Sequence, residues 1–106
     1  MERTTIKQIF QDMAAFDGRR VTIAGWVRTI RASNAFGFIE LNDGSYFTNL
    51  QVVFEEEKLE NYKLIAKQNV GCSLVIEGTV TLTPEAKQPL ELKAERIEIE
   101  GASSPD

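Results

Sequence analysis

Three consecutive segments between residues 21 and 54 alternate apolar and polar residues, and this pattern limits the fold more than any other feature of the chain. A period of two places successive side chains on opposite faces of a β-strand. In the segment 36–42, Ile39 and Leu41 occupy one face, and Phe38 lies among polar residues on the other. We therefore expect a large aromatic side chain on the outer face of the second strand.

The two neighbouring segments place polar groups on the same outer face. In 50–54 the residues on either side of Gln51 belong to the core, so Gln51 points outward. In 21–31 the alternation turns Arg28 outward beside Trp26. A surface that combines an arginine, an aromatic ring and an amide is suited to binding an unpaired nucleobase.

Helical periodicity and further alternation complete the set of predicted elements. Thr5 can cap a helix whose apolar residues recur at i, i+3, i+4 and i+7 as far as Phe16. The last strand needs one change of phase near Glu95, which a β-bulge would provide. The predicted helices cover 5–16 and 57–68, and the predicted strands cover 21–31, 36–42, 50–54, 73–83 and 90–100.

The order helix, three strands, helix, two strands is that of the OB-fold. This fold is a five-stranded Greek-key barrel that binds oligonucleotides or oligosaccharides across its second and third strands. We therefore predict an all-β fold with capping helices. One helix would precede the barrel, and the other would lie between strands 3 and 4.

Length and composition indicate one small domain without the usual groups of an enzyme. A chain of 106 residues supports a single modest core. It has no histidine and one cysteine, Cys72, so we predict no catalytic residue, no metal site and no internal disulfide. No apolar run approaches the roughly 20 residues that cross a bilayer, and no signal segment is present. We expect a cytoplasmic protein that does not bind membranes.

The net charge of −4 argues against binding that depends mainly on phosphate charge. Its distribution is uneven, however, because the stretch between Asp17 and Glu40 contains four arginines and no acidic residue. We therefore expect nucleic acid to bind locally and through its bases.

Several short motifs occur in a fixed order and make the chain resemble a known family. They are GWVRTIR, FGFIELNDGS, NLQVVFEE and EGTVTLTPEAKQPLELKAERIEIEG. Together they resemble the N-terminal anticodon-binding domain of bacterial asparaginyl-tRNA synthetases, from the class II subgroup that includes the aspartyl and lysyl enzymes. The resemblance covers about residues 19–106. It is most specific in DGSYFTNLQVVFE and TPEAKQPLELKAE.

This resemblance implies a tRNA anticodon-binding role for five residues. Phe38 matches the aromatic residue that stacks on the central uridine, and Gln51 matches the amide that reads a base edge. Arg31 matches an arginine that contacts phosphate or base, and Glu91 matches an acidic hydrogen-bond acceptor. Arg28 lies at a position whose residue type varies among the relatives.

The resemblance also implies the parent protein and its partners. The chain would recognise the GUU anticodon loop of tRNA(Asn) as the N-terminal domain of asparagine-tRNA ligase. By itself it would need no cofactor and would not be an enzyme, whereas the full-length ligase would use ATP and Mg²⁺ and would form a homodimer. Residues 1–18 would form a helix packed on the barrel, 19–101 the anticodon-binding domain, and 102–106 the start of a linker to the catalytic domain.

Three other functions are compatible with the same residues. The domain could belong to an aspartyl-tRNA synthetase, because the reader of the third anticodon base is not located by the sequence. It could be a general single-strand-binding OB domain, although the net charge of −4 disfavours this. It could also be a protein-interaction module. An acidic residue such as Glu91 in the base-reading surface distinguishes an anticodon-binding domain from a general single-strand-binding domain, because a non-specific domain has no need for an acidic group there.

Overall fold

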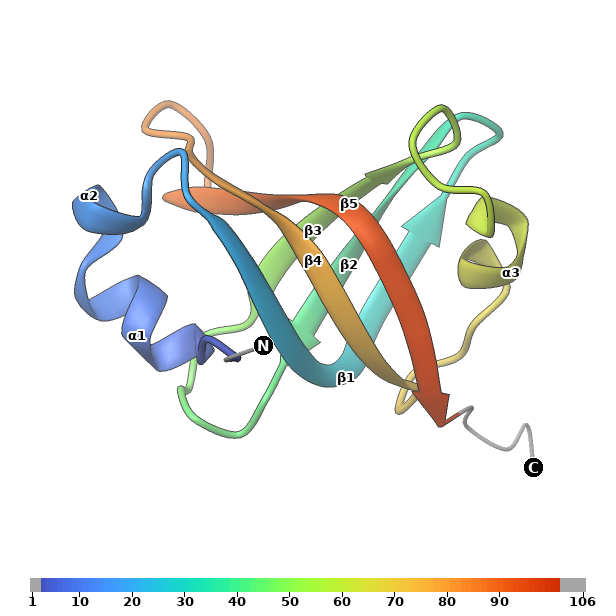
Figure 1. Ribbon diagram of the computed structural model, residues 1–106, viewed down its shortest axis with the longest axis horizontal. Helices are drawn as coiled ribbons and strands as arrows, with labels where there is room; N and C mark the ends of the chain where they lie inside the picture. Colours follow the sequence, from blue (N-terminus) through green and yellow to red (C-terminus); the bar gives the residue numbers. More distant parts are fainter. Residues whose placement is uncertain (1–2, 102–106) are drawn as a thin grey trace.

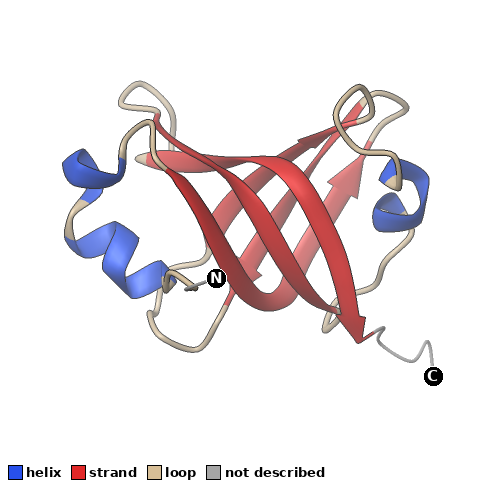
Figure 2. Cartoon of the chain, viewed as in Figure 1, coloured by secondary structure: helices blue, strands red, loops and turns tan. Residues whose placement is uncertain are grey.

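A computed structural model describes residues 3–101 of the protein as a closed barrel of five strands with three short helices (Figures 1 and 2). The strands follow one another around the barrel in the order β1-β2-β3-β5-β4. They are β1 (Arg20–Ala32), β2 (Phe36–Asn42), β3 (Leu50–Glu55), β4 (Ser73–Leu82) and β5 (Leu90–Gly101). All pairs are antiparallel except β3 with β5, which run parallel. This arrangement confirms the predicted OB-fold, while the predicted linker over 102–106 lies outside the described residues.

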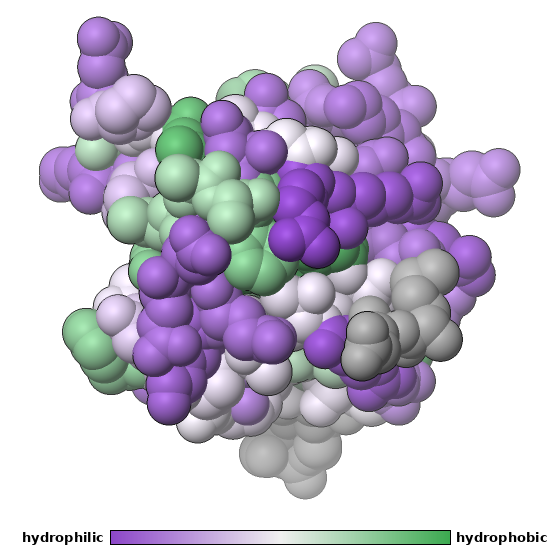
Figure 3. All heavy atoms as spheres, turned by 60° about the vertical axis from the view of Figure 1, so that its left-hand side comes forward, coloured by the Kyte–Doolittle hydropathy of each residue, from purple (hydrophilic) through white to green (hydrophobic). Residues whose placement is uncertain are grey.

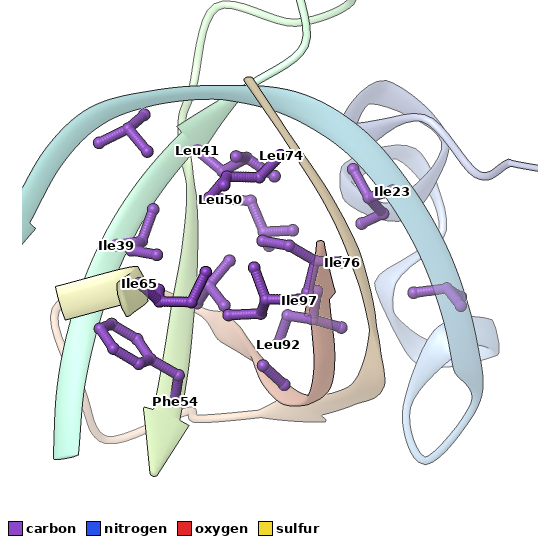
Figure 4. Close-up of a cluster of buried hydrophobic side chains, with 14 of the residues drawn as sticks. Ile23, Ile39, Leu41, Leu50, Phe54, Ile65, Leu74, Ile76, Leu92 and Ile97 are labelled. Carbon is purple, nitrogen blue, oxygen red and sulfur yellow. The ribbon is translucent and has the colours of Figure 1, made fainter. Parts of the chain in front are cut away.

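The interior of the barrel is filled by aliphatic side chains from every strand (Figure 4). Ile39 and Leu41 from β2 are fully buried, as the alternation predicts. Leu50, Val52 and Phe54 fill the same space from β3. Because inward residues alternate with outward ones along each strand, burying this set also fixes which side chains face solvent.

The predicted N-terminal helix is present but is broken into two pieces, α1 (Ile6–Gln11) and α2 (Met13–Phe16). Thr5 caps α1 as expected, since its side chain accepts from the amide of Gln8 in a capping box. The break occurs at Asp12, which has φ −148° and ψ 56° and so cannot continue the helix. Asp12 instead starts α2, because its carbonyl accepts from the amides of Ala15 and Phe16.

The second helix is shorter than predicted, because α3 covers only Tyr62–Ala66 instead of 57–68. The residues before it form turns in which the amide of Leu59 donates to the carbonyl of Glu55 at 3.2 Å. The side chain of Asn61 donates to the carbonyl of Ile97 in β5 at 2.9 Å and fixes this segment to the barrel. Local turns and one tertiary hydrogen bond therefore take the place of the predicted helix over 57–61.

Within residues 3–101 the strand pairings show three register shifts, one at the start of β4 between Ser73 and Leu74 and two that bear on the predictions. In β5, Arg96 pairs with Glu77 and Ala94 pairs with Gly78, so Glu95 is the extra residue of a bulge. This confirms the predicted change of phase. The second irregularity lies in β1 and was not predicted. It is described with the candidate interface below.

The helices lie on two opposite sides of the barrel, with α1 and α2 on one side and α3 on the other (Figure 1). On the side of α1 and α2, hydrophobic side chains lie among hydrophilic ones on the surface (Figure 3). Phe10, Met13 and Phe16 from this side pack against the core and are only partly buried. Among residues 3–101, no helix is long and apolar enough to span a membrane.

Candidate nucleic-acid interface

The outer face of β1, β2 and β3 carries most of the residues that the sequence analysis singled out, and Glu91 lies beside it on β5. Arg31 on β1 pairs with Phe38 on β2, and Phe38 pairs with Val53 on β3. Two residues further along β2, and therefore on the same face, Glu40 pairs with Gln51. Side chains of directly paired residues point to the same side of a sheet. The register therefore brings the arginine, the aromatic ring and the amide together on one surface.

Phe38 is half-buried and packs edge-on against Phe36, with ring centroids 5.6 Å apart and planes at 87°. Phe36 is itself 46% exposed. A hollow of about 260 Å³ lies beside the two rings and is lined by Arg31, Ala32, Ser33, Phe36 and Phe38. Rings fixed in this way present an apolar surface beside a cation, which is the combination that stacks a base.

A β-bulge at Arg28 explains how Arg31 reaches this surface. The register shifts between Val27, which pairs with Leu41, and Thr29, which pairs with Glu40. Strict alternation from the buried Val27 would turn Arg31 into the core. The extra residue restores the phase, so that Ile30 pairs with Ile39 and Arg31 becomes exposed.

Arg28 is the extra residue of this bulge and is exposed. The structure does not place Arg28 directly across from an outward residue of β2. Thr29 pairs with Glu40 and Arg31 pairs with Phe38. Neither Arg28 nor Arg31 forms an ion pair with any residue in 3–101. Their guanidinium groups are thus available to a phosphate or a base.

Gln51 and Glu91 meet across the parallel pair of β3 and β5. The Gln51 Nε2 donates to the Glu91 Oε2 at 3.4 Å, and both residues are half-buried. An ionised carboxylate has about four acceptor sites, so Glu91 keeps most of them free while it orients the amide. Together the two groups offer donors and acceptors to the edge of a base.

The loop between β2 and β3 adds polar residues that the sequence analysis did not single out. Asn49 donates to Glu40 at 3.3 Å and accepts from the side chain of Asn42 at 2.8 Å. The Asn42 side chain also accepts from the amide of Gly44 at 2.7 Å. The Asn-Asp-Gly-Ser sequence signals a turn, but it does not reveal that these amides bond to one another.

The loop over 33–35 at the other end of the face is tied to α3. Tyr62 donates its hydroxyl hydrogen to the carbonyl of Ser33 at 2.7 Å. Burial raises the pKa of the Tyr62 hydroxyl above its usual value, and the charge of Glu56 adds to the effect. The hydroxyl therefore stays protonated at neutral pH and can hold the loop beside Phe36 and Phe38.

A larger hollow of about 590 Å³ lies elsewhere, between the 58–61 segment and β5. Most of the residues that line it are charged, and several form ion pairs with their neighbours. One example is Arg20, which lies 3.7 Å from Glu77 and 3.9 Å from Glu95. Residues 3–101 contain no cluster of acidic or cysteine side chains that could hold a metal ion. The volume of a hollow therefore does not by itself identify the candidate interface.

Comparisons with known proteins agree with the fold. Residues 21–100 match a family model described as the OB-fold nucleic acid binding domain tRNA_anti-codon. Over 106 residues the chain is 56% identical to asparagine–tRNA ligase from Acetivibrio thermocellus and 51% identical to the ligase from Clostridium acetobutylicum. Each match covers 100% of this chain and 23% of the relative.

A solved structure shows the same fold. The crystal structure of asparaginyl-tRNA synthetase from Pyrococcus horikoshii complexed with asparaginyl-adenylate superposes with a TM-score of 0.84. It covers 98% of this chain and 23% of that protein, at 24% sequence identity.

The matched part of the bacterial ligases is their N-terminal 23%. This chain therefore corresponds to less than a quarter of the length of those enzymes. With the family match extending over residues 21–100, the chain belongs to the anticodon-binding family of OB-fold nucleic-acid-binding domains.

Proposed function

We propose that this domain recognises the GUU anticodon loop of tRNA(Asn), with the central uridine stacked on Phe38. The observation that carries the proposal is the set of three side chains on one outer face. The Phe38 ring is fixed by Phe36, and the hydrogen-bonded pair of Gln51 and Glu91 lies on the adjoining strands. A ring next to an oriented donor and acceptor can hold a base and test its edge.

Each residue has a separate task in this proposal. Phe38 stacks on the unpaired base, a contact that is worth about 1–3 kcal/mol. Gln51 and Glu91 hydrogen-bond to base edges, and Arg28 and Arg31 contact phosphate or base. A carboxylate such as Glu91 favours base reading over non-specific binding, because it would repel the phosphate backbone.

The proposal extends to the protein that contains this domain. By similarity to its relatives, the full-length chain would be an asparagine–tRNA ligase. We expect it to act in the cytoplasm. It would form a homodimer and use ATP and Mg²⁺ at its catalytic domain, while the domain described here uses no cofactor. The anticodon domain of an aspartyl enzyme is the second candidate, because Phe38 and Gln51 alone do not distinguish the third anticodon base.

Titration with short RNA stem-loops tests the proposal. The ligands are a 17-nucleotide anticodon stem-loop with GUU and two matched stem-loops, one with a central cytidine and one with GUC. We expect the domain to prefer GUU to both. We expect Phe38→Ala to weaken GUU binding by about 5- to 150-fold and to remove the preference for uridine.

The control is Leu64→Ala, which removes an exposed apolar side chain of α3 that does not line the hollow beside Phe38. It should leave binding unchanged. Equal affinity of the unmodified domain for uridine and cytidine would contradict anticodon reading. Preference for GUC over GUU would instead support the aspartyl alternative.

A further inference from the structure

The loop over 43–49, between β2 and β3, holds an aromatic residue in solvent. Phe47 is 86% exposed, which is the largest value among the large hydrophobic residues of 3–101. The Phe47 ring lies against Tyr46, with ring centroids 4.4 Å apart and planes at 37°. Tyr46 in turn stacks on Phe10 of α1 at 5.3 Å and 17°. One face of the exposed ring is thus supported by a short column of aromatic rings.

The backbone of this loop is fixed by hydrogen bonds on both sides. The Asn42 side chain bonds to the backbone of Gly44 and Tyr46 and to the side chain of Asn49. On the side of the helix, Asp43 accepts from the amide of Ile6 at 2.9 Å. The position of Phe47 is therefore set before any ligand binds, which lowers the entropy cost of binding.

The loop continues the outer face that carries Phe38. Asn42, at the end of β2, pairs with Trp26 on β1, and a Cβ atom on Gly44 would lie 3.4 Å from the Trp26 ring. In Figure 1 the 43–49 loop lies at the lower left and the 33–35 loop at the upper right, which are opposite ends of this face. Asn42 is the fourth residue after Phe38 along β2, which corresponds to about 13 Å.

The geometry points to a second base-stacking position at Phe47, which takes an unpaired nucleobase of the same RNA loop. Stacked nucleotides rise by about 3.4 Å each, so the length of β2 from Phe38 to Asn42 alone corresponds to about four nucleotides. Phe38 and Phe47 therefore serve separate nucleotides. An OB domain spans roughly 4–16 nucleotides, which leaves room for both.

Stacking on Phe47 does not depend on the identity of the base. The nearest side-chain amides, Asn42 and Asn49, already bond to each other and to the loop, so they are not free to read a base edge. Every base has a π-face that an aromatic ring can support. Phe47 thus contributes affinity, whereas the Phe38 surface contributes discrimination.

This inference rests on the proposed function, and the experiment separates the two. The 106-residue chain is titrated with the GUU stem-loop and with its central-cytidine variant. The variants are Phe47→Ala, Phe47→Trp and, as a matched control, Val70→Ala, which removes another exposed apolar side chain between α3 and β4. A 2-aminopurine placed in turn at each loop position reports which base stacks. Each variant is first checked for unchanged thermal unfolding, which we expect because Phe47 is exposed.

We expect Phe47→Ala to weaken both stem-loops by the same factor, about 5- to 150-fold, and Phe47→Trp to restore binding. One 2-aminopurine position should lose its quenching in Phe47→Ala, and a different position should lose it in Phe38→Ala. If the unmodified domain does not distinguish uridine from cytidine, the proposed function fails. If it does, but Phe47→Ala binds within twofold of Val70→Ala, the second stacking position is wrong and Phe47 is available to a protein partner instead.

Discussion

At the scale of single residues, Gly37 is the position on which the candidate interface depends most directly. Gly37 precedes Phe38 in β2 and points inward, and a Cβ atom there would lie 2.5 Å from the Phe54 ring and 2.9 Å from the carbonyl oxygen of Arg31. The absent side chain leaves space for the largest ring of the barrel core. A packed core beneath Phe38 thus requires glycine beside it.

We predict that Gly37→Ala destabilises the domain by about 1–3 kcal/mol, because the buried Phe54 ring must move to admit a methyl group. Urea denaturation measures the loss. Gly101→Ala is the matched control, since a Cβ atom at Gly101 meets nothing within 4 Å. It should change the free energy of unfolding by less than about 0.5 kcal/mol. Equal effects of the two substitutions would contradict this explanation.

Single residues also show how far the sequence could predict the interface. The outward positions of Phe38 and Gln51 follow from alternation, because their neighbours are strongly apolar. Arg31 does not follow, since the bulge at Arg28 reverses the phase of the strand. One signal was available, because Ile30 fits the core only if such a bulge exists. The roles of these residues in binding RNA stay predictions.

At the scale of secondary-structure elements, the loop after β2 fixes the N-terminal helix to the barrel. The Asp43 carboxylate accepts from the amide of Ile6 at 2.9 Å, and the Ser45 hydroxyl accepts from the amide of Lys7 at 3.0 Å. Asp43 also accepts from the amide and the hydroxyl of Ser45. Two first-turn amides of α1, which have no partner within the helix, are thus satisfied by the Asp-Gly-Ser turn, and Thr5 satisfies the amide of Gln8.

We predict that Asp43→Ala lowers the free energy of unfolding by about 1–3 kcal/mol, because it leaves the buried Ile6 amide without a charged acceptor. Amide hydrogen exchange at Ile6 and Lys7 should accelerate. The control is Asp12→Ala, because the Asp12 side chain caps no helix amide and is exposed. If exchange in α1 accelerates equally in both variants, the loop does not hold the helix.

The helices show why element boundaries were less predictable than the strands. The periodicity of 5–16 indicates a single helix, but Asp12 divides it and the two pieces pack separately on one side of the barrel. The predicted helix over 57–68 keeps only Tyr62–Ala66, because Asn61 bonds to β5 instead. At Asn61 a contact distant in sequence accompanies the departure from the predicted helix, and no local pattern records such a contact. At Asp12 the backbone angles break the helix, although the apolar periodicity continues through it.

At the scale of the whole molecule, charge and fold lead to different expectations for RNA binding. The OB architecture was predictable from the order of the elements, and the family match agrees with it. The net charge of −4, however, is unfavourable for a ligand that carries one negative charge per nucleotide. Binding through bases resolves this conflict, because stacking and edge recognition do not require a positive molecule. The dependence of affinity on salt distinguishes the two modes.

We predict a shallow salt dependence for the GUU stem-loop. If Arg28 and Arg31 make the phosphate contacts, the slope of log affinity against log salt is about −1.4, so raising salt from 50 to 200 mM weakens binding about sevenfold. Arg31→Gln should reduce the slope to about −0.7, whereas Lys67→Gln, at the end of α3, should leave it unchanged. A slope steeper than about −4 would mean that phosphate contacts dominate. Base stacking on Phe38 and Phe47 would then be a minor contribution, because a charge-driven complex loses affinity with salt in proportion to the counterions it releases.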